Sequence, residues 1–311
     1  GDSGIVVLNQ TPFYAESGGQ QGDRGSLTSA NGSYQVMGTK KFGSHFGHEG
    51  KLGMGELKVG DTVNARVEGP RRQATALNHS ATHLLHAALR TVLGDHVTQK
   101  GSLVTHERTR FDFSHPQPVT AEELIAIESM VNREIRQNEV VETRVMPIEE
   151  AKAAGAMALF GEKYDDEVRV LSMGDFSVEL CGGTHVARTG DIGLFKILSE
   201  GGVASGVRRI EAVTGEGALE QVVALEATLD QAAALLKTGA DSIVSKIEQM
   251  TERLKVAERE ADALKMKLAT QAGGDLLDDV VDVCGVQCLV ASLDGQDPKT
   301  LRDTLDRVKN R

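Results

Sequence analysis

Short runs of apolar and β-branched residues alternate with turn residues over the first part of the chain. Such runs occupy residues 4–8, 33–37 and 62–67, and glycines and polar residues interrupt the chain between them. Short strands punctuated by turns are typical of small antiparallel sheets and barrels. We therefore predict a glycine-rich, β-barrel-like subdomain over residues 1–68.

Beyond this segment, apolar residues recur at the spacing of amphipathic helices. Residues 71–93 have one apolar stripe, and residues 120–137 open with a Thr-Ala-Glu-Glu capping box and have another. Strand-like runs follow between residues 168 and 213. A mixture of helices and strands over about 150 residues predicts an α+β domain at 69–216.

The last third of the chain has the pattern of long helices. A break at Thr238-Gly239 separates two helical stretches, and the second has apolar residues at heptad spacing: Ile247, Met250, Leu254, Ala257, Ala261, Leu264 and Leu268. We predict a helical hairpin over 217–272 whose two seams bury each other, in preference to an interface with another protein. Residues 273–311 alternate strand-like and helical stretches, and we interpret them as the truncated start of an α/β C-terminal domain.

Composition and charge narrow the class of protein. No apolar run approaches the roughly 20 residues that span a bilayer, and the N-terminus lacks the regions of a secretory signal. Lys and Arg number 34 against 45 Asp and Glu, a formal charge of −11. This excludes nucleic-acid binding through bulk positive charge, but a local basic groove is still compatible with it. The chain begins without Met, so we interpret it as a piece of a longer protein.

The three cysteines, Cys181, Cys284 and Cys288, are an odd and sparse set. They cannot all pair within one chain, which indicates a reducing compartment rather than a disulfide scaffold. Cys284 and Cys288 lie in a separate segment, and we expect them to pack as small apolar side chains.

Two histidines and a Cys-His pair form the pattern with the clearest chemistry. His79 and His83 lie four residues apart on a predicted helix, so both imidazoles project from one face. Cys181 and His185 follow a predicted strand, and the Gly-Gly-Thr between them lets the backbone fold both side chains inward. Three imidazoles and a thiolate suit tetrahedral Zn²⁺, so we predict that these four residues bind one zinc ion.

The number of ligands leaves two roles for the metal open. Four protein ligands are typical of a structural site, whereas a catalytic site keeps one position for water or substrate. Small polar residues occur close to the motif, among them Thr82, Gln99 and Ser102. A purely structural site needs no such lining, so catalytic zinc stays open beside structural zinc.

Five motifs occur in the order found in alanyl-tRNA synthetases: Ala15-Glu16-Ser17-Gly18-Gly19-Gln20, His79-x-x-x-His83, Gln99-Lys100-Gly101-Ser102, Cys181-Gly182-Gly183-Thr184-His185 and Gly206-Val207-Arg208-Arg209-Ile210. Over essentially its whole length the chain resembles the editing half of bacterial members of this family. Its central part is also similar to free-standing alanyl-tRNA deacylases and to the editing domain of threonyl-tRNA synthetase. The resemblance implies a zinc-containing editing core at 69–216. It also implies that an aminoacylation domain, absent here, precedes this region in the parent protein.

The activity implied by the resemblance is hydrolysis of the ester of mischarged Ser-tRNA(Ala) and Gly-tRNA(Ala), with Ala-tRNA(Ala) spared. A pocket built for alanine cannot strongly exclude glycine or serine, whereas a second site can select serine by bonding its hydroxyl. Gln99, Ser102 and Thr82 are the candidate substrate-binding residues. Gln99, Cys181 and Thr82 are the candidate catalytic residues.

The partner implied by the resemblance is the 3′ end of tRNA(Ala), in the cytoplasm. Arg208 and Arg209 are candidate contacts to its phosphates. Arg71 and Arg72 are either further phosphate contacts or solvated surface charge. Truncation is expected to reduce oligomerisation of the chain.

Two other classes of protein are compatible with the same sequence. One is a zinc-stabilised tRNA-binding module without catalysis, whose metal is purely structural. The other is a dimerisation module in which the helices drive assembly and the upstream region is inactive. A deacylation assay distinguishes the first from an editing enzyme, and the mass in solution distinguishes the second.

Overall fold

The computed structural model describes residues 3–153, 155, 157, 166–275, 279–292, 301–302, 305–306 and 309. Packing divides the chain into two compact units, Gly1–Ala224 and Leu225–Arg311. Among the described residues, no helix combines the length and the apolar character needed to cross a membrane.

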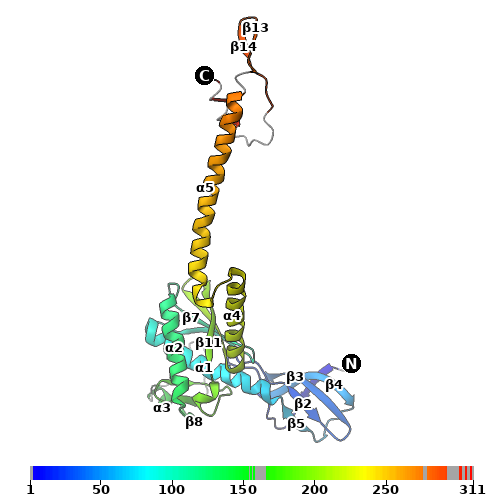
Figure 1. Cartoon of the computed structure of the whole chain (residues 1–311). Helices are drawn as coiled ribbons and strands as arrows, with labels where there is room; N and C mark the ends of the chain where they lie inside the picture. Colours follow the sequence, from blue (N-terminus) through cyan, green and yellow to red (C-terminus); the bar gives the residue numbers. More distant parts are fainter. Residues whose placement is uncertain are drawn as a thin grey trace. The chain divides into compact units, whose positions relative to one another are not determined.

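The N-terminal sheet has five antiparallel strands in the order β1-β4-β3-β2-β5 (Figure 1). They are β1 (Ser3–Val7), β2 (Gly25–Thr28), β3 (Gly32–Phe42), β4 (His45–Gly55) and β5 (Asn64–Val67). The predicted barrel is wrong, because a barrel requires its first and last strands to pair. In the described residues β1 and β5 are short strands at opposite edges, so the sheet stays open. Alternating strand-like runs are the same in an open sheet and a barrel, which is why the sequence did not separate them.

An ion pair connects the N-terminal sheet to the first long helix, α1 (Gly69–Leu93). Asp23, which is buried, accepts from the Arg72 guanidinium, with Arg72 Nε 3.1 Å from Oδ1. The same guanidinium donates to the carbonyl of Pro12 at 2.7 Å. Arg71 also lies on α1, and it donates to Gln21 Oε1 at 3.1 Å. Both arginines that were candidate phosphate contacts therefore hold the sheet against α1.

The α+β core follows, and it contains two further antiparallel sheets. The four-stranded sheet has the order β11-β12-β7-β6, and the three-stranded sheet has the order β10-β9-β8. Its elements after α1 are β6 (Gln99–Val104), β7 (Thr109–Ser114), α2 (Ala121–Gln137), β8 (Val141–Pro147), α3 (Ile148–Ala153), β9 (Glu167–Met173), β10 (Ser177–Leu180), a 3-10 turn (Thr189–Ile192), β11 (Phe195–Ala204) and β12 (Val207–Thr214). The predicted α+β class is confirmed.

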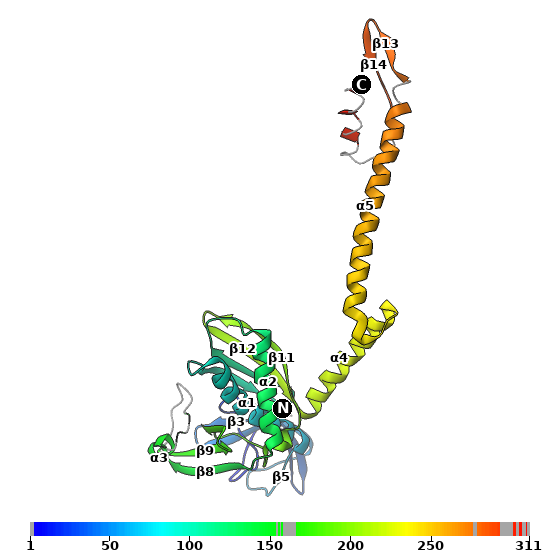
Figure 2. The same cartoon turned by 60° about the vertical axis from the view of Figure 1, so that its left-hand side comes forward.

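The α1 helix is the centre of this core. It packs on α2, on the four-stranded sheet and on β10, so it is covered on several sides (Figures 1 and 2). Leu84, Leu85 and Leu89 are fully buried with Phe111 and Phe113 of β7. Because apolar contacts surround the helix, the polar residues between those leucines are buried with them. This is how the fold places imidazoles in a protein interior.

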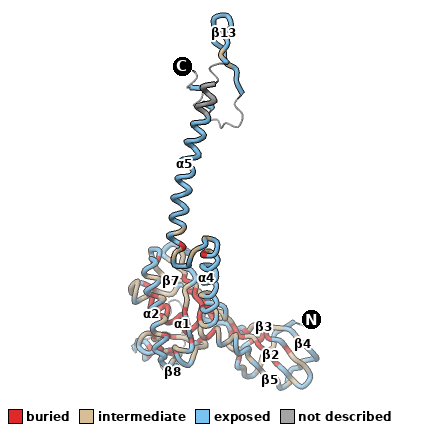
Figure 3. The backbone as a smooth tube through the Cα atoms, viewed as in Figure 1, coloured by how far each residue is buried: buried red, intermediate tan, exposed pale blue. Residues whose placement is uncertain are grey.

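The second unit contains the end of α4 (Gly215–Leu236), a 3-10 turn (Ala240–Ser242) and α5 (Ile243–Asp275). The predicted helix break is confirmed, and Lys237 has a left-handed backbone there (φ 52°). The helical hairpin predicted over 217–272 is not confirmed. The heptad residues are exposed, with Leu254 at 60% and Leu268 at 64% (Figure 3). A heptad pattern predicts a helix that can be buried on one side, but it does not specify the partner.

The chain after α5 contains a small hairpin of β13 (Val281–Val283) and β14 (Val286–Cys288). The expectation that Cys284 and Cys288 pack as small apolar side chains is wrong, because both are exposed. The short hairpin encloses no core that could bury them. Much of the predicted helical stretch near the C-terminus lies outside the described residues.

Candidate metal centre

α1 presents His79 and His83 from consecutive turns of its buried face. Both side chains are buried, and their rings stack with centroids 5.2 Å apart. The four-residue spacing predicts this arrangement, and packing of α1 between a sheet and α2 fixes it.

The loop after β10 supplies the other two residues, Cys181 and His185. Gly183 allows the loop to pass close to α1, because a Cβ at this position would lie 2.1 Å from His79 Cε1. Arg169 of β9 tethers the loop: its Nη1 donates to the carbonyls of Gly182 (3.3 Å) and Gly183 (3.0 Å). Its own carbonyl accepts from the backbone N–H of Cys181 at 3.0 Å.

The four residues predicted as zinc ligands converge on one point. One ligand atom from each of His79, His83, Cys181 and His185 lies within 4.8 Å of the others. Cys181 Sγ is 3.6 Å from His79 Nε2 and 3.2 Å from His185 Nε2. Tetrahedral zinc with bonds of about 2.0–2.3 Å separates its ligands by roughly 3.3–3.7 Å. The observed separations are therefore close to those of a four-coordinate zinc site.

Each histidine has its Nδ1 held by a different polar group. His79 Nδ1 is 2.7 Å from Gln20 Oε1, and His83 Nδ1 is 2.6 Å from Glu179 Oε2. His185 Nδ1 is 3.2 Å from the Ser80 hydroxyl. Such partners are typical of metal-binding histidines, because they orient the ring and leave Nε2 for the metal.

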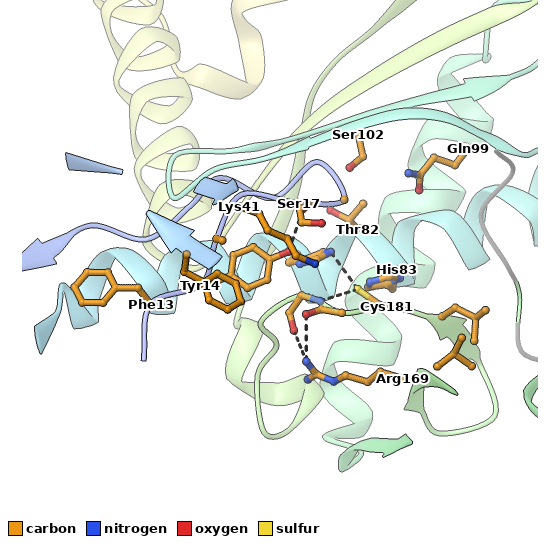
Figure 4. A pocket seen from close by; sticks show the side chains of 18 of the residues that line it. Phe13, Tyr14, Ser17, Lys41, Thr82, His83, Gln99, Ser102, Arg169 and Cys181 are labelled. Carbon is orange, nitrogen blue, oxygen red and sulfur yellow. Dashed lines mark hydrogen bonds between the residues drawn. The ribbon is translucent and has the colours of Figure 1, made fainter. Parts of the chain in front are cut away.

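An orphaned nitrogen supports the same interpretation. His83 Nε2 is buried and has no hydrogen-bond partner within the described residues, a costly arrangement unless another group contacts it. It faces the cluster formed with Cys181, as the close-up in Figure 4 shows. The donor set and this orphaned atom together fit a zinc ion.

The charges in the centre favour a thiolate. Burial alone would lower the pKa of His83, but the Glu179 carboxylate and the Cys181 sulfur raise it to about 10. Burial opposes ionisation of Glu179, yet its histidine partners lower its pKa to about 2. Burial also opposes ionisation of Cys181, but the positive charge of His83 brings its pKa well below the ordinary value. Burial lowers the pKa of His185 to about 3. The Cys181 thiolate and the neutral His185 imidazole are in their metal-binding forms, whereas His83 must release a proton to bind a metal.

A cavity of about 510 Å³ opens beside the four residues (Figure 4). Its wall includes Thr82 of α1 and both Gln99 and Ser102 of β6, together with Cys181. The structure thus brings the three predicted substrate-binding residues to one cavity with three of the four predicted metal ligands, His79, His83 and Cys181. The wall also includes two cations, Lys41 and Arg169. Three aromatic residues of the N-terminal region contribute to it as well: Phe13, Tyr14 and Phe46.

The polar groups of the wall differ in what they can still bind. Thr82 Oγ1 donates to the Asn78 carbonyl at 2.7 Å and lies 2.6 Å from Thr109 Oγ1. Its oxygen is therefore available only as an acceptor. The side chains of Gln99 and Ser102 have no hydrogen-bond partner within the described residues. They are free to bond a ligand.

Arg208 and Arg209 lie on β12, and neither lines this cavity. Arg208 forms a two-point ion pair with Glu200, at 2.6 and 2.7 Å. Arg209 forms another with Asp112, at 2.7 and 2.8 Å. Both guanidinium groups are thus neutralised by carboxylates, and the structure does not bring them to the predicted metal ligands.

Comparison with known proteins gives matches along the whole chain. Residues 1–71 match the family model for class II (A) tRNA synthetases, and residues 168–211 match the second additional domain of threonyl and alanyl tRNA synthetases. An alanine–tRNA ligase of Stenotrophomonas maltophilia is 60% identical over 310 residues, which is 99% of this chain and 35% of that protein. The chain is homologous to alanine–tRNA ligase. The resemblance inferred from the motifs is confirmed, and the chain spans about a third of the length of this relative.

The residues of the candidate metal centre fall in different parts of the matched sequence. Cys181 and His185 lie within the second additional domain, together with Glu179. His79 and His83 lie between the two matched segments, and Gln20 lies in the class II segment.

Sequence reasoning missed the residues that hold the predicted ligands. Glu179 lies two residues before Cys181, so strand alternation would have placed both on one side of β10. It also accepts from His86 Nδ1 at 3.0 Å, so the buried His86 lies beside the predicted ligands. No feature of the sequence indicated that Ser80 would hold His185. Gln20 lay inside a recognised motif, but nothing local in the sequence points to His79.

Proposed function

We propose that this chain hydrolyses the ester that joins serine or glycine to tRNA(Ala), and spares Ala-tRNA(Ala). The observation that supports this most is the convergence of Thr82, Gln99, Ser102 and the His-Cys cluster on one cavity. The homology to an alanine–tRNA ligase and the match to the second additional domain agree with it. A tRNA partner implies a cytoplasmic location, which we propose with it.

His79, His83, Cys181 and His185 would hold one zinc ion. When bound, the metal supplies positive charge that anchors the substrate and polarises the ester carbonyl. Ligation by all four residues at once favours the anchoring role. Gln20, Glu179 and Ser80 keep the three imidazoles oriented, so the residues of the centre need little rearrangement to bind metal.

The wall of the cavity supplies selection for serine. The serine hydroxyl can donate to Thr82 Oγ1, whose own hydrogen is committed to Asn78. The amide of Gln99 and the hydroxyl of Ser102 offer a donor and an acceptor from β6. Alanine would leave these groups unpaired, and that cost favours serine. Glycine has no hydroxyl, so this selection applies to serine alone.

The reaction requires water to attack the ester carbonyl. We propose that Gln99 and Thr82, which line the cavity, hold that water or the serine side chain, and that Cys181 would hold a metal ion beside them. Arg208 and Arg209 stay candidates for phosphate contacts, although each must leave or share a carboxylate to make one. Lys41 and Arg169 line the cavity itself and are further cations for the tRNA end.

The test is incubation of the purified chain with Ser-, Gly- and Ala-tRNA(Ala), each with and without a chelator. We expect release of serine and glycine at rates at least tenfold above that of alanine, with loss of both rates after metal removal. Equal rates for the three substrates, or none for any, would overturn the proposal.

A second candidate function is a metal-stabilised tRNA-binding or dimerisation module without catalysis. The complete four-residue ligand set and the exposed heptad residues of α5 favour it. It predicts that the chain binds tRNA(Ala) or self-associates with equal strength whichever amino acid is attached, and that no ester is hydrolysed.

A further inference from the structure

Gln20 has its side chain in the metal centre although it belongs to a loop of the N-terminal region. It is 1% exposed. Its Oε1 lies 2.7 Å from His79 Nδ1 and accepts from the backbone N–H of Thr184 at 2.9 Å. Its Nε2 donates to Thr184 Oγ1 at 2.8 Å. The amide therefore bonds both the α1 side and the loop side of the centre.

These bonds determine which ring nitrogen of His79 carries a hydrogen. A backbone N–H can only donate, so the Gln20 atom facing Thr184 N is the amide oxygen. The same oxygen faces His79 Nδ1, which must then carry the hydrogen. The lone pair of His79 is thereby left on Nε2, which points to Cys181 Sγ 3.6 Å away. An imidazole that carries its hydrogen on Nδ1 can bind a metal through Nε2.

The loop that carries Gln20 is fixed to β6 on both sides of that residue. Gly19 O accepts from Val104 N at 2.8 Å, and Gln21 N donates to Val104 O at 2.9 Å. Gly19 has a left-handed backbone (φ 81°), and a Cβ there would lie 2.4 Å from Ser102 O. The backbone of Gln20 is thus held against the strand that provides Gln99 and Ser102.

We infer that Gln20 is a positioning residue of the metal centre, and that the N-terminal region thereby completes a site whose four ligands all lie in the α+β core. The inference rests on the proposed metal site. It goes beyond it, because a segment matching the class II (A) model would set the metal affinity of residues in the second additional domain. The N-terminal region then contributes a defined bond to the centre in addition to a wall of the cavity.

The decisive variants are Gln20→Met and Gln20→Glu in the full chain. Gln20→Met keeps the length and volume of the side chain but removes every hydrogen bond. Gln20→Glu keeps an oxygen for His79 Nδ1 and Thr184 N, and the Thr184 hydroxyl can turn to donate to it. The matched control is Gln21→Met, since the Gln21 side chain accepts from Arg71 and does not contact the centre.

The measurements are zinc affinity, by competition with a chromophoric chelator, and the visible absorption of Co²⁺ bound in place of zinc. We expect Gln20→Met to bind zinc 10–100-fold more weakly and to alter the Co²⁺ spectrum, the range found for groups that orient metal ligands. We expect Gln20→Glu to bind zinc at least as tightly as the unaltered chain, and Gln21→Met to match the unaltered chain in both measurements.

Equal zinc affinity in Gln20→Met and Gln21→Met would overturn the role of Gln20 and leave the metal site standing. Absence of zinc binding in the unaltered chain would overturn the metal site, and the inference with it. If Gln20→Met does not fold, Gln20→Glu decides, because affinity below that of the unaltered chain contradicts the inference.

Discussion

α1 and α5, with 25 and 33 residues, are the two longest helices among the described residues, and they differ in what they bury. α1 buries His79, His83 and several small polar residues, whereas α5 leaves the leucines of its heptad exposed. The difference follows from the hydrogen-bond and packing partners that surround each helix. Asn78 of α1 donates to the carbonyl of Thr105 at 2.9 Å and accepts from the Thr214 hydroxyl at 2.7 Å, so its burial costs little. Burial thus depends on what surrounds a helix as much as on its own pattern.

The largest expected effect is on zinc content, which should depend on residues of α1 and not on residues of α5. The double variant His79→Ala/His83→Ala should reduce bound zinc from one ion per chain to none, because it removes two of four ligands. Elemental analysis of protein purified without added zinc measures this.

The matched control is Met250→Ala/Leu254→Ala, which makes two changes at the same spacing on α5. We expect full zinc content in this control. Zinc retained by the histidine variant, or lost by the control, would contradict the assignment of the metal to α1.

A second prediction concerns the buried carboxylate that faces α1. Glu179→Ala leaves His83 and His86 without their shared acceptor, and it should reduce the free energy of unfolding by about 3 kcal/mol. Urea denaturation with chelator present measures this without the contribution of metal. Glu179→Gln retains an acceptor oxygen and should lose less. A loss below about 1 kcal/mol in Glu179→Ala would show that the buried polar side of α1 contributes little to stability.

A third prediction distinguishes residues that bind the metal from residues that recognise the substrate. Gln99→Ala should leave zinc content and melting temperature nearly unchanged, because Gln99 lies on β6 and bonds no ligand residue. Hydrolysis of Ser-tRNA(Ala) should fall by about tenfold, as expected for one lost hydrogen bond of roughly 1.4 kcal/mol.

Cys181→Ala provides the contrast, since it should lose zinc together with activity. If Gln99→Ala lost zinc as readily as Cys181→Ala, Gln99 would belong to the metal centre. Full activity in Gln99→Ala would remove it from the substrate site.

The smallest effect is expected on α5. Leu254 is 60% exposed, so Leu254→Ala should change the free energy of unfolding by no more than about 0.5 kcal/mol. Light scattering at the protein concentration of the unfolding experiment shows whether the folded chain is a monomer or a dimer there. A larger loss that disappears on dilution would mean that a second copy of the chain covers the heptad residues.

Local patterns were sufficient to predict the long helices and to select four side chains that the structure brings together, His79, His83, Cys181 and His185. The i, i+4 spacing of His79 and His83 needs no knowledge of the rest of the fold. The residues that orient these ligands are a different case. Gln20 and Glu179 bond histidines that lie 59 and 96 residues away in the sequence, so no local period relates them. The same reason explains the barrel, because closing it would require β1 to pair with β5, about 60 residues further along the chain.

Cys284 and Cys288 are exposed on the hairpin of β13 and β14, whereas Cys181 faces three imidazoles. The three thiols of the chain therefore differ in reactivity toward a thiol reagent. Two should be titrated at once in any sample, and the third only when no metal covers it. The stoichiometry of thiol modification, two or three per chain, consequently reports the occupancy of the centre without a substrate. It also means that oxidation in storage should cross-link chains through the hairpin before it reaches a metal-bound Cys181.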